Sequence, residues 1–190
     1  IMTIDLVKYD SSKGCIKVYK LTNKNGAIVE LSSIGAGIIS IIVPDKNDCL
    51  SDVVLGYNNI TDYFYDGPCA GKTAGRYANR IAKGHLVIND KLYQLNLNCG
   101  PNSLHGGKEG FQNQNWDSEI IDNKIVFSYL SKDGEENFPG NISVKVEYEW
   151  TDDNTLIINY SATTDRETVL NLTNHTYFNL KGYGNGNILL

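Results

Sequence analysis

Residues 143–162 read SVKVEYEWTDDNTLIINYSA, a stretch in which apolar and polar side chains alternate. Alternation with period two puts successive side chains on opposite faces of a strand. The apolar face of the first half is formed by Val144, Val146, Tyr148 and Trp150. After a turn at 152–154, a matching apolar face is formed by Leu156, Ile158, Tyr160 and Ala162. Strands with one polar and one apolar side are typical of antiparallel sheets, so this hairpin predicts an antiparallel fold.

The rest of the chain carries the same β pattern, with turn residues between short apolar runs. No range reads as a long amphipathic helix, and only 60–65 is expected to form a turn or two of helix. We expect further strands at 15–21, 27–32, 38–43, 85–88, 91–95, 119–121 and 124–130. Many short strands separated by turns predict an all-β sandwich or barrel. No internal repeat or linker is visible, so the 190 residues are expected to form one domain.

The composition of the chain argues against two classes of binding partner, nucleic acids and membranes. Apolar residues make up 41% of the chain and charged residues 21%, as in ordinary soluble globular proteins. The net charge of −5 and the lack of a Lys/Arg-rich run argue against nucleic acid as a partner. No apolar stretch approaches the roughly 20 residues that a membrane-spanning helix needs, so no membrane partner is expected.

The N-terminus and the cysteines favour the cytoplasm. No basic segment followed by a long apolar segment opens the chain, so we see no secretory signal. The cysteines lie 34, 20 and 30 residues apart, at Cys15, Cys49, Cys69 and Cys99, which is far from metal-ligand or redox spacing. We therefore expect reduced thiols and a cytoplasmic protein.

Residues 171–180, NLTNHTYFNL, place a histidine between polar side chains and two aromatic ones. A strand expected over 168–173 leads into this stretch and would put Asn171, Thr173 and His175 on one face. An imidazole at a strand end, on a polar face and beside aromatic rings, indicates a small pocket for a polar ligand. The alternative is a histidine that only satisfies backbone groups at the end of a strand.

Two long, less periodic regions, 67–84 and 96–115, each contain a candidate site residue. Loops of this length in a compact domain are more often functional than idle. The first holds Asn79 and Arg80, whose amide and guanidinium donors suit sugar hydroxyls, although the arginine could instead pair with a surface carboxylate. The second holds His105, followed by two glycines that allow a close approach of ligand or backbone.

Three motifs connect these residues to a family. Residues 171–180 are similar, without a gap, to the signature of the aldose 1-epimerases, also called galactose mutarotases. Residues 75–81, GRYANRI, resemble a second motif of that family, and residues 102–107, NSLHGG, resemble a third. The motifs occur in the family's order and the resemblance covers essentially the whole chain. It implies an antiparallel β-sandwich of the galactose mutarotase type.

The resemblance also implies roles for particular residues. His175 corresponds to the family's general acid, and His105 to a histidine that binds the sugar. Asn79 and Arg80 correspond to the pair that contacts the sugar, whereas Arg76 is expected to be structural. Histidine suits the acid role because a pKa of about 6.5 lets it hold and release a proton near neutrality. No cofactor is implied, and no metal site is expected, because the three histidines lie 20 and 70 residues apart without a metal-ligand pair.

The family's chain is considerably longer than 190 residues, and its substrate-binding Asp and catalytic Glu lie beyond the position of Leu190. Ile188 to Leu190 look like the opening of another strand. We therefore expect residues 1–190 to be a single domain, the N-terminal part of a larger mutarotase-like β-sandwich that is incomplete in this chain. Without that Glu, the chain is expected to be impaired as a catalyst on its own.

The implied activity is that of an isomerase, an aldose 1-epimerase, which interconverts the α and β anomers of free hexoses such as galactose and glucose by acid–base ring opening and closure. Two alternatives stay open. One is a non-catalytic carbohydrate-binding β-sandwich, since one fold hosts many functions. The other is a relative that acts on hexose 6-phosphates, which calls for more basic residues around the pocket than Lys72, Arg76 and Arg80. The preferred hexose and the oligomeric state stay open.

Overall fold

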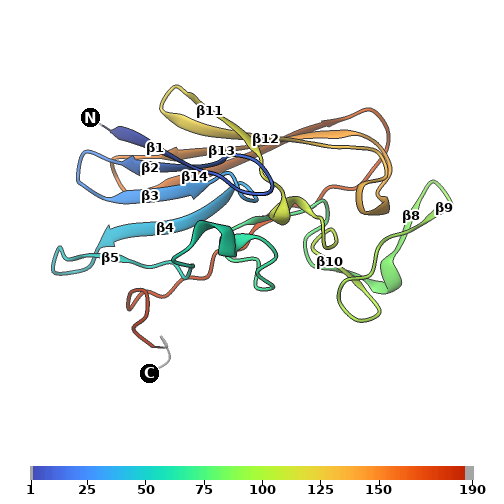
Figure 1. The fold of residues 1–190 in the computed structure, drawn as a ribbon, viewed down its shortest axis with the longest axis horizontal. Helices are drawn as coiled ribbons and strands as arrows, with labels where there is room; N and C mark the ends of the chain where they lie inside the picture. The colour runs from blue at the N-terminus through green and yellow to red at the C-terminus, as the bar shows by residue number, and fades with distance from the viewer. Residues whose placement is uncertain (1, 187–190) are drawn as a thin grey trace.

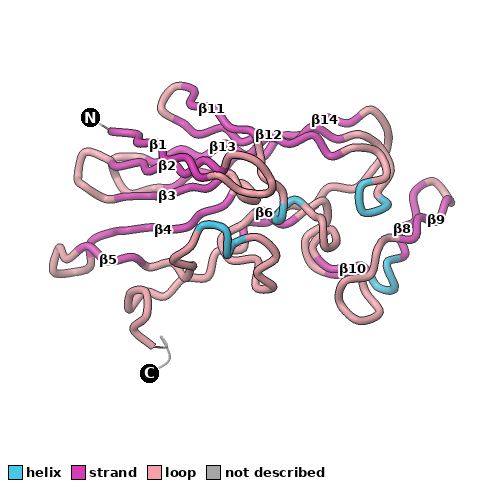
Figure 2. Tube along the Cα trace, viewed as in Figure 1, coloured by secondary structure: helices cyan, strands magenta, loops and turns pink. Residues whose placement is uncertain are grey.

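The computed structural model describes residues 2–186, which form two antiparallel sheets packed face to face (Figures 1 and 2). The first sheet runs in the order β1 (Thr3–Tyr9), β2 (Ile16–Thr22), β3 (Ile28–Ser32), β4 (Gly37–Pro44) and β5 (Leu50–Asp52). The second sheet runs in the order β11 (Asp117–Ile121), β12 (Lys124–Ser131), β13 (Ile142–Trp150) and β14 (Leu156–Thr164). Strands that are neighbours in sequence are neighbours in space, so each sheet is a meander.

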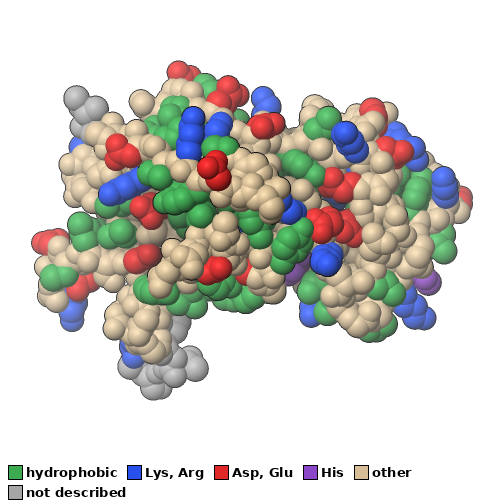
Figure 3. Space-filling model, viewed as in Figure 1, with side chains coloured by type: hydrophobic (Ala, Val, Ile, Leu, Met, Phe, Trp, Pro, Cys, Tyr) green, Lys and Arg blue, Asp and Glu red, His purple; other side chains and the backbone are tan. Residues whose placement is uncertain are grey.

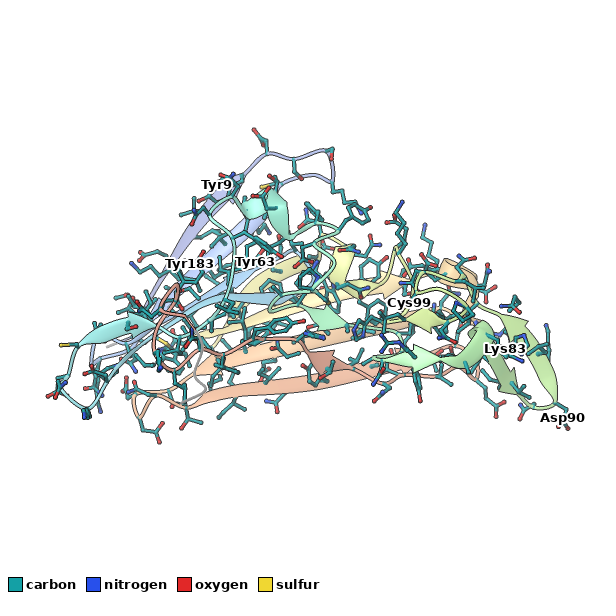
Figure 4. The ribbon with its side chains drawn as sticks, turned by 90° about the horizontal axis from the view of Figure 1, so that it is seen from below. Tyr9, Tyr63, Lys83, Asp90, Cys99 and Tyr183 are labelled. Carbon is teal, nitrogen blue, oxygen red and sulfur yellow. The ribbon has the colours of Figure 1, made fainter. Side chains whose placement is uncertain are left out.

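Shorter elements fill the connection between the sheets and the segment after β14. Three two-stranded ladders are formed by β6 (Thr73–Ala74) with β15 (Thr173–Asn174), β7 (Arg80–Ile81) with β10 (Ser103–Leu104), and β8 (His85–Ile88) with β9 (Lys91–Gln94). The 3₁₀ helices are η1 (Ile60–Tyr63), η2 (Ala82–Gly84), η3 (Phe111–Asn113) and η4 (Glu135–Asn137). The β8–β9 hairpin projects from one end of the molecule, with Asp90 at its tip (Figure 4).

The main core lies between the two sheets. On β13 the apolar positions of the alternating pattern are all buried, and opposite them the first sheet contributes Tyr19, Leu21, Val29 and Leu31. Complete burial of one such side chain contributes about 1.5–3 kcal/mol, so this layer is the main source of stability. Hydrogen bonds also join the sheets, since the Tyr148 hydroxyl donates to the Ala36 carbonyl at 2.6 Å and the Trp150 indole donates to the Ala27 carbonyl at 3.1 Å.

The prediction of an all-β, antiparallel fold is confirmed. Apart from 168–173, every strand expected from the sequence is present within two residues of its expected bounds, and the turn of helix expected at 60–65 is η1. The sequence pattern does not predict β1 or β5. Most side chains of β1 are exposed, and β5 has three residues, so neither strand carries a continuous apolar face.

The strand expected at 168–173 is wrong. Only Thr173 and Asn174 belong to a strand, and Asn171 forms an isolated bridge with Tyr77. The backbone of Asn171 accepts a hydrogen bond from Ala78 and donates one to the Arg76 carbonyl, at 2.7 and 2.8 Å. Because this partner is a loop that makes only isolated pairings, the ladder does not propagate.

The apolar face expected on β14 is correct at one end only. Leu156 and Ile158 pack against the core, but Tyr160 is 39% exposed and Ala162 is exposed as well. The long strands β12–β14 extend beyond the first sheet, so the far end of β14 has no part of that sheet over it (Figure 1).

Positive and negative side chains are interspersed over the face of the molecule shown in Figure 3. None of the helices within residues 2–186 is long and apolar enough to cross a membrane. The strand opening expected at Ile188 to Leu190 lies outside the described residues.

Candidate active site

Arg76 lies in the loop between β6 and β7 and attaches this loop to the second sheet. It is 2% exposed, and its guanidinium donates to Ser131 Oγ at 2.9 and 3.0 Å and to the carbonyls of Pro139 and Gly140, both at 2.8 Å. The planar five-donor fork of arginine satisfies several fixed acceptors at once. Arg76 therefore has the structural role expected of it. It ties the loop that carries Asn79 to the end of β12 and to the turn after η4.

Asn79 and His105 hold each other in place. The backbone N–H of Asn79 donates to Nδ1 of His105 at 3.0 Å, and the backbone N–H of His105 donates to the Asn79 carbonyl at 3.0 Å. Both residues lie in the left-handed region, with φ of +71° and +53°. Because Nδ1 accepts a hydrogen bond, the proton of the neutral imidazole is on Nε2. His105 therefore presents an N–H donor on the side of the ring that is not tied to Asn79.

Arg80 follows Asn79 at the start of β7 and is exposed. Its backbone N–H donates to Oδ1 of Asn79 at 2.9 Å, and its guanidinium approaches the same oxygen at 3.4 Å. β7 pairs with β10, in a register that sets Arg80 opposite Leu104, the residue before His105. The two loops of the sequence motifs are thus joined by a ladder directly beside the candidate residues.

His175 rests on the segment that leads into β6. Its backbone N–H donates to the Lys72 carbonyl at 2.9 Å, and its carbonyl accepts from the Gly71 N–H at 3.0 Å. The side chain of the preceding residue, Asn174, donates to the Gly71 carbonyl at 2.9 Å and accepts from the backbone N–H of Thr176 at 3.1 Å. Residues on both sides of the histidine are therefore fixed by hydrogen bonds.

The two imidazoles meet at one hollow. The ring centroids of His105 and His175 are 5.2 Å apart with the planes at 85°, and the ring of Tyr177 lies 5.0 Å from that of His175. The hollow has a volume of about 540 Å³. It is lined by Ala78, Asn79, His105 and the residues 171–176. Asn171, Thr173 and His175 line it, and so do the residues between them, so the lining does not follow the alternation of a strand.

The surroundings of His105 disfavour its protonated form. Burial lowers the pKa of His105, and the positive charges of His175 and Arg80 lower it further. His105 is therefore suited to act as a neutral hydrogen-bond donor.

Comparison with known proteins shows the family to which the chain belongs. The family profile described as "Aldose 1-epimerase" matches residues 17–189. The chain belongs to the aldose 1-epimerase family. It is 42% identical over 178 residues to the galactose mutarotase of Sus scrofa, which covers 94% of this chain and 52% of that protein. It is 43% identical over 167 residues to the aldose 1-epimerase of Haemophilus influenzae, which covers 87% of this chain and 48% of that protein.

Solved structures of aldose 1-epimerases and their homologues have the same fold. A GalM/aldose epimerase homologue from C. elegans superposes with a TM-score of 0.82 at 33% identity, over 95% of this chain and 52% of that chain. Galactose 1-epimerase from Lactobacillus acidophilus superposes with a TM-score of 0.84 at 29% identity, over 95% of this chain and 54% of that chain. The chain spans about half the length of the curated relatives that it matches.

All four residues that the aldose 1-epimerase motifs single out lie together. Asn79, His105 and His175 line the hollow, and Arg80 is bonded to Asn79 beside it. Asn174 and Lys72, which hold the backbone of His175, were not among the sequence candidates. The signal for Asn174 is an Asn followed two residues later by a Thr, a pattern in which the amide oxygen accepts from the backbone N–H ahead of it. Lys72 carries no such local signal.

Among the other hollows, two bear on where the chemistry is assigned. One, of about 440 Å³, shares His105 and extends to Tyr65 and Gln112. The other, of about 820 Å³, lies over the outer face of the first sheet, where Tyr9, Tyr63 and Tyr183 gather (Figure 4). The hollow of about 820 Å³ has no histidine in its lining, and that of about 440 Å³ has His105 without His175. We therefore assign the chemistry to the hollow of about 540 Å³, which both imidazoles line. Among residues 2–186, no group of three His, Cys, Asp or Glu side chains is arranged to hold a metal ion.

Proposed function

We propose that the protein is an aldose 1-epimerase that interconverts the α and β anomers of free hexoses such as galactose and glucose. The observation that carries the proposal is the pair of imidazoles 5.2 Å apart, which line one hollow together with Asn79. Membership of the aldose 1-epimerase family supports the reaction class. The names of the relatives, galactose mutarotase and aldose 1-epimerase, support an aldose as the substrate.

Mutarotation requires two proton transfers. A base removes the proton of the anomeric hydroxyl while an acid protonates the ring oxygen, so that the C1–O5 bond breaks and an aldehyde forms. Rotation about the C1–C2 bond presents the other face of the aldehyde. The reverse transfers then close the ring as the opposite anomer. Atoms and electrons balance within the sugar, so no oxidant or reductant takes part.

We assign the acid to His175 and the sugar-binding role to His105, Asn79 and Arg80. The role of His105 follows from its surroundings. His105 has a lowered pKa and an occupied Nδ1, so it acts as a neutral Nε2–H donor to a sugar oxygen. The acid role of His175 follows from its place in the aldose 1-epimerase signature at 171–180 and from its position in the hollow, from which it would protonate the ring oxygen. Asn79 and Arg80 contribute amide and guanidinium donors at the same edge of the hollow.

The base, by family resemblance, is a glutamate that these 190 residues do not supply, together with a substrate-binding aspartate. We propose that residues 1–190 are the N-terminal part of a larger mutarotase-like β-sandwich. A correctly placed acid or base contributes about 10²–10⁴-fold, so this chain alone is expected to be strongly impaired.

The test is polarimetry of freshly dissolved α-D-galactose with the protein specified by the complete coding sequence. His175→Ala should lower kcat by about 10²–10⁴-fold while circular dichroism shows an unchanged fold. His85→Ala is the matched control, because His85 is exposed on β8 and does not line the hollow. An unchanged rate in His175→Ala would remove this residue from the mechanism.

A non-catalytic sugar-binding module would give a different result. It would bind galactose in calorimetry without accelerating mutarotation. Of the three basic residues near the motif, Lys72, Arg76 and Arg80, two are buried, which argues against a hexose 6-phosphate as the substrate. Lys72 is 1% exposed and Arg76 is 2% exposed, so only Arg80 is open to a phosphate. Polarimetry with α-D-glucose 6-phosphate beside α-D-glucose compares these substrates directly.

We further propose that the protein acts in the cytoplasm. All four cysteines are free thiols, in agreement with a reducing compartment.

A further inference from the structure

Lys72 is a buried cation directly behind His175. Its side chain is 1% exposed and that of its partner Asp66 is 2% exposed, with Nζ and Oδ1 2.7 Å apart. Nζ also donates to the Tyr63 carbonyl at 2.5 Å and to Oδ1 of Asn113 at 3.0 Å. The Lys72 ammonium thus makes two hydrogen bonds and one ion pair, all within the protein. Lys72 is therefore not available to bind a sugar.

The pair fixes the loop from 66 to 72. Besides its ion pair with the lysine, Asp66 accepts from the Ala70 N–H at 2.8 Å and from the Tyr57 hydroxyl at 3.1 Å, so its carboxylate bonds within the loop and also joins the loop to Tyr57. A buried ion pair is often no better for stability than apolar residues of the same volume. What it does provide here is a defined geometry, because each partner also bonds one backbone group and one further side chain.

His175 is attached to this same loop by its backbone. The Lys72 carbonyl accepts the His175 N–H at 2.9 Å, and the Gly71 N–H donates to the His175 carbonyl at 3.0 Å. The Tyr177 hydroxyl donates to the Pro68 carbonyl at 2.9 Å, which adds a further tie from the other side of the histidine. A displacement of the 66–72 loop would therefore displace the imidazole of His175.

We propose that Lys72, through its buried pair with Asp66, is a positioning residue for His175. It holds the 66–72 loop in the one arrangement that sets the imidazole at the hollow and against His105. The inference rests on the proposed function, in which His175 is the acid. Because a misplacement of about 1 Å can cost about 10²-fold in rate, loss of this support should appear in kcat more than in KM.

The first experiment is Lys72→Met in the full-length protein, which keeps the length of the side chain and removes its charge. We expect kcat to fall by about 10- to 100-fold while KM for galactose changes by less than about threefold. Lys124→Met is the matched control, since Lys124 pairs with Glu147 and Glu149 at 3.0 and 3.2 Å on the partly exposed face of the second sheet. It should leave both constants unchanged. A folded Lys72→Met protein with wild-type kcat would overturn the proposal.

A second measurement does not depend on catalysis. Hydrogen exchange of the His175 amide reports the bond to the Lys72 carbonyl directly. We expect this amide to exchange at least about tenfold faster in Lys72→Met, while the amide of Val146 in the core of β13 keeps its wild-type rate. Unchanged exchange at His175 would contradict the proposal. If the wild-type protein fails to accelerate mutarotation, the proposed function falls, and this exchange result still decides the positioning role.

A third variant covers the case in which Lys72→Met does not fold, because it leaves Asp66 buried and unpaired. Asp66→Asn combined with Lys72→Met removes both charges and so avoids that cost. The double variant still lacks the hydrogen bonds of Nζ to Tyr63 and Asn113. We expect it to show the same loss of kcat, and wild-type kcat in this variant would overturn the proposal.

Discussion

His105 adopts a backbone conformation that few L-residues adopt, and so does its partner Asn79. Such a conformation costs about 1–3 kcal/mol and persists only where surrounding contacts enforce it. Here the two residues exchange hydrogen bonds between the Asn79 peptide and the peptide and ring of His105. Asparagine tolerates the left-handed region better than most residues, which suits position 79. The exchange orients the imidazole before any ligand arrives.

The surroundings of His105 predict a pH dependence of stability. Its pKa in the folded protein lies below the ordinary value of 6.5, mainly because of burial. As the pH falls through about 6.5, the unfolded chain takes up this proton more readily than the folded one. The corresponding stability is present above that pH and is lost as the pH falls below it. Thermal unfolding should therefore show a lower Tm at pH 5.5 than at pH 7.5.

His105→Asn isolates this contribution, because the Asn side chain does not titrate and its Oδ1 can still accept from the Asn79 N–H. The fall in Tm between the two pH values should be smaller in this variant than in the wild type. His85→Asn, on the exposed face of β8, should keep the wild-type dependence. An equal fall in His105→Asn and in the wild type would show that His105 is not the source.

At the scale of elements, Arg76 links a loop to the second sheet. Its guanidinium satisfies acceptors on β12 and in the turn at 139–140, and it lies over the ring of Phe138 at 5.7 Å. Arg76→Ala would leave several buried acceptors unpaired and open a cavity. We expect it to lower the free energy of unfolding by about 3–5 kcal/mol, measured by urea denaturation.

Arg76→Lys tests whether the stability depends on the several donors of the guanidinium group or only on its positive charge. A single ammonium cannot reach all of these acceptors, so we expect a substantial part of the loss to remain. Arg166→Ala, at an exposed guanidinium 3.5 Å from Asp133, should leave the denaturation midpoint unchanged. An Arg76→Ala protein as stable as the wild type would contradict the structural role.

The regular strands could be predicted from the sequence because each contains a local pattern of β-forming residues bounded by turn residues. The alternation of 143–150 survives as an alternation of buried and exposed side chains in β13. The stretch at 168–173 shows where this reasoning fails, because its residues favour a strand but its partner is the irregular loop at 76–78. Pairing depends on the partner as well as on the strand itself.

The residues of the candidate site also fall into two groups, those indicated by a local sequence motif and those brought together only by folding. That Asn79, Arg80, His105 and His175 lie close together could be expected from short motifs similar to those of one family. Lys72 could not, because its burial depends on Asp66, Tyr63 and Asn113, which come together only in the folded chain.

At the scale of the whole molecule, the second sheet has an open edge. Within residues 2–186, β14 is paired on one side only, with β13, and its exposed side chains include Ile157 and Tyr160. An unpaired edge strand with apolar side chains is a template for association. We expect the 190-residue chain to self-associate, with a sedimentation coefficient that rises with protein concentration.

Ile157→Lys should reduce this association, because a charge on an edge strand opposes pairing with another chain. Leu130→Lys is the matched comparison, since Leu130 is exposed on β12, which lies inside the sheet. It should have the smaller effect if the edge and not the sheet face drives association. If the unsubstituted chain sediments as a monomer at every concentration tested, the open edge of β14 does not drive self-association.

The backbone of His175 has consequences for how the protein tolerates heat. Gly71, which bonds to His175, accepts the Ile38 N–H of the first sheet at 2.8 Å, and Asn174 donates to the Tyr148 hydroxyl of the second sheet at 3.3 Å. Through Gly71 and Asn174, the backbone around His175 is thus hydrogen-bonded to both sheets of the sandwich. If the proposed function is correct, loss of activity on warming should coincide with unfolding of the entire sandwich, without an earlier step in which the proposed active site alone loses its structure.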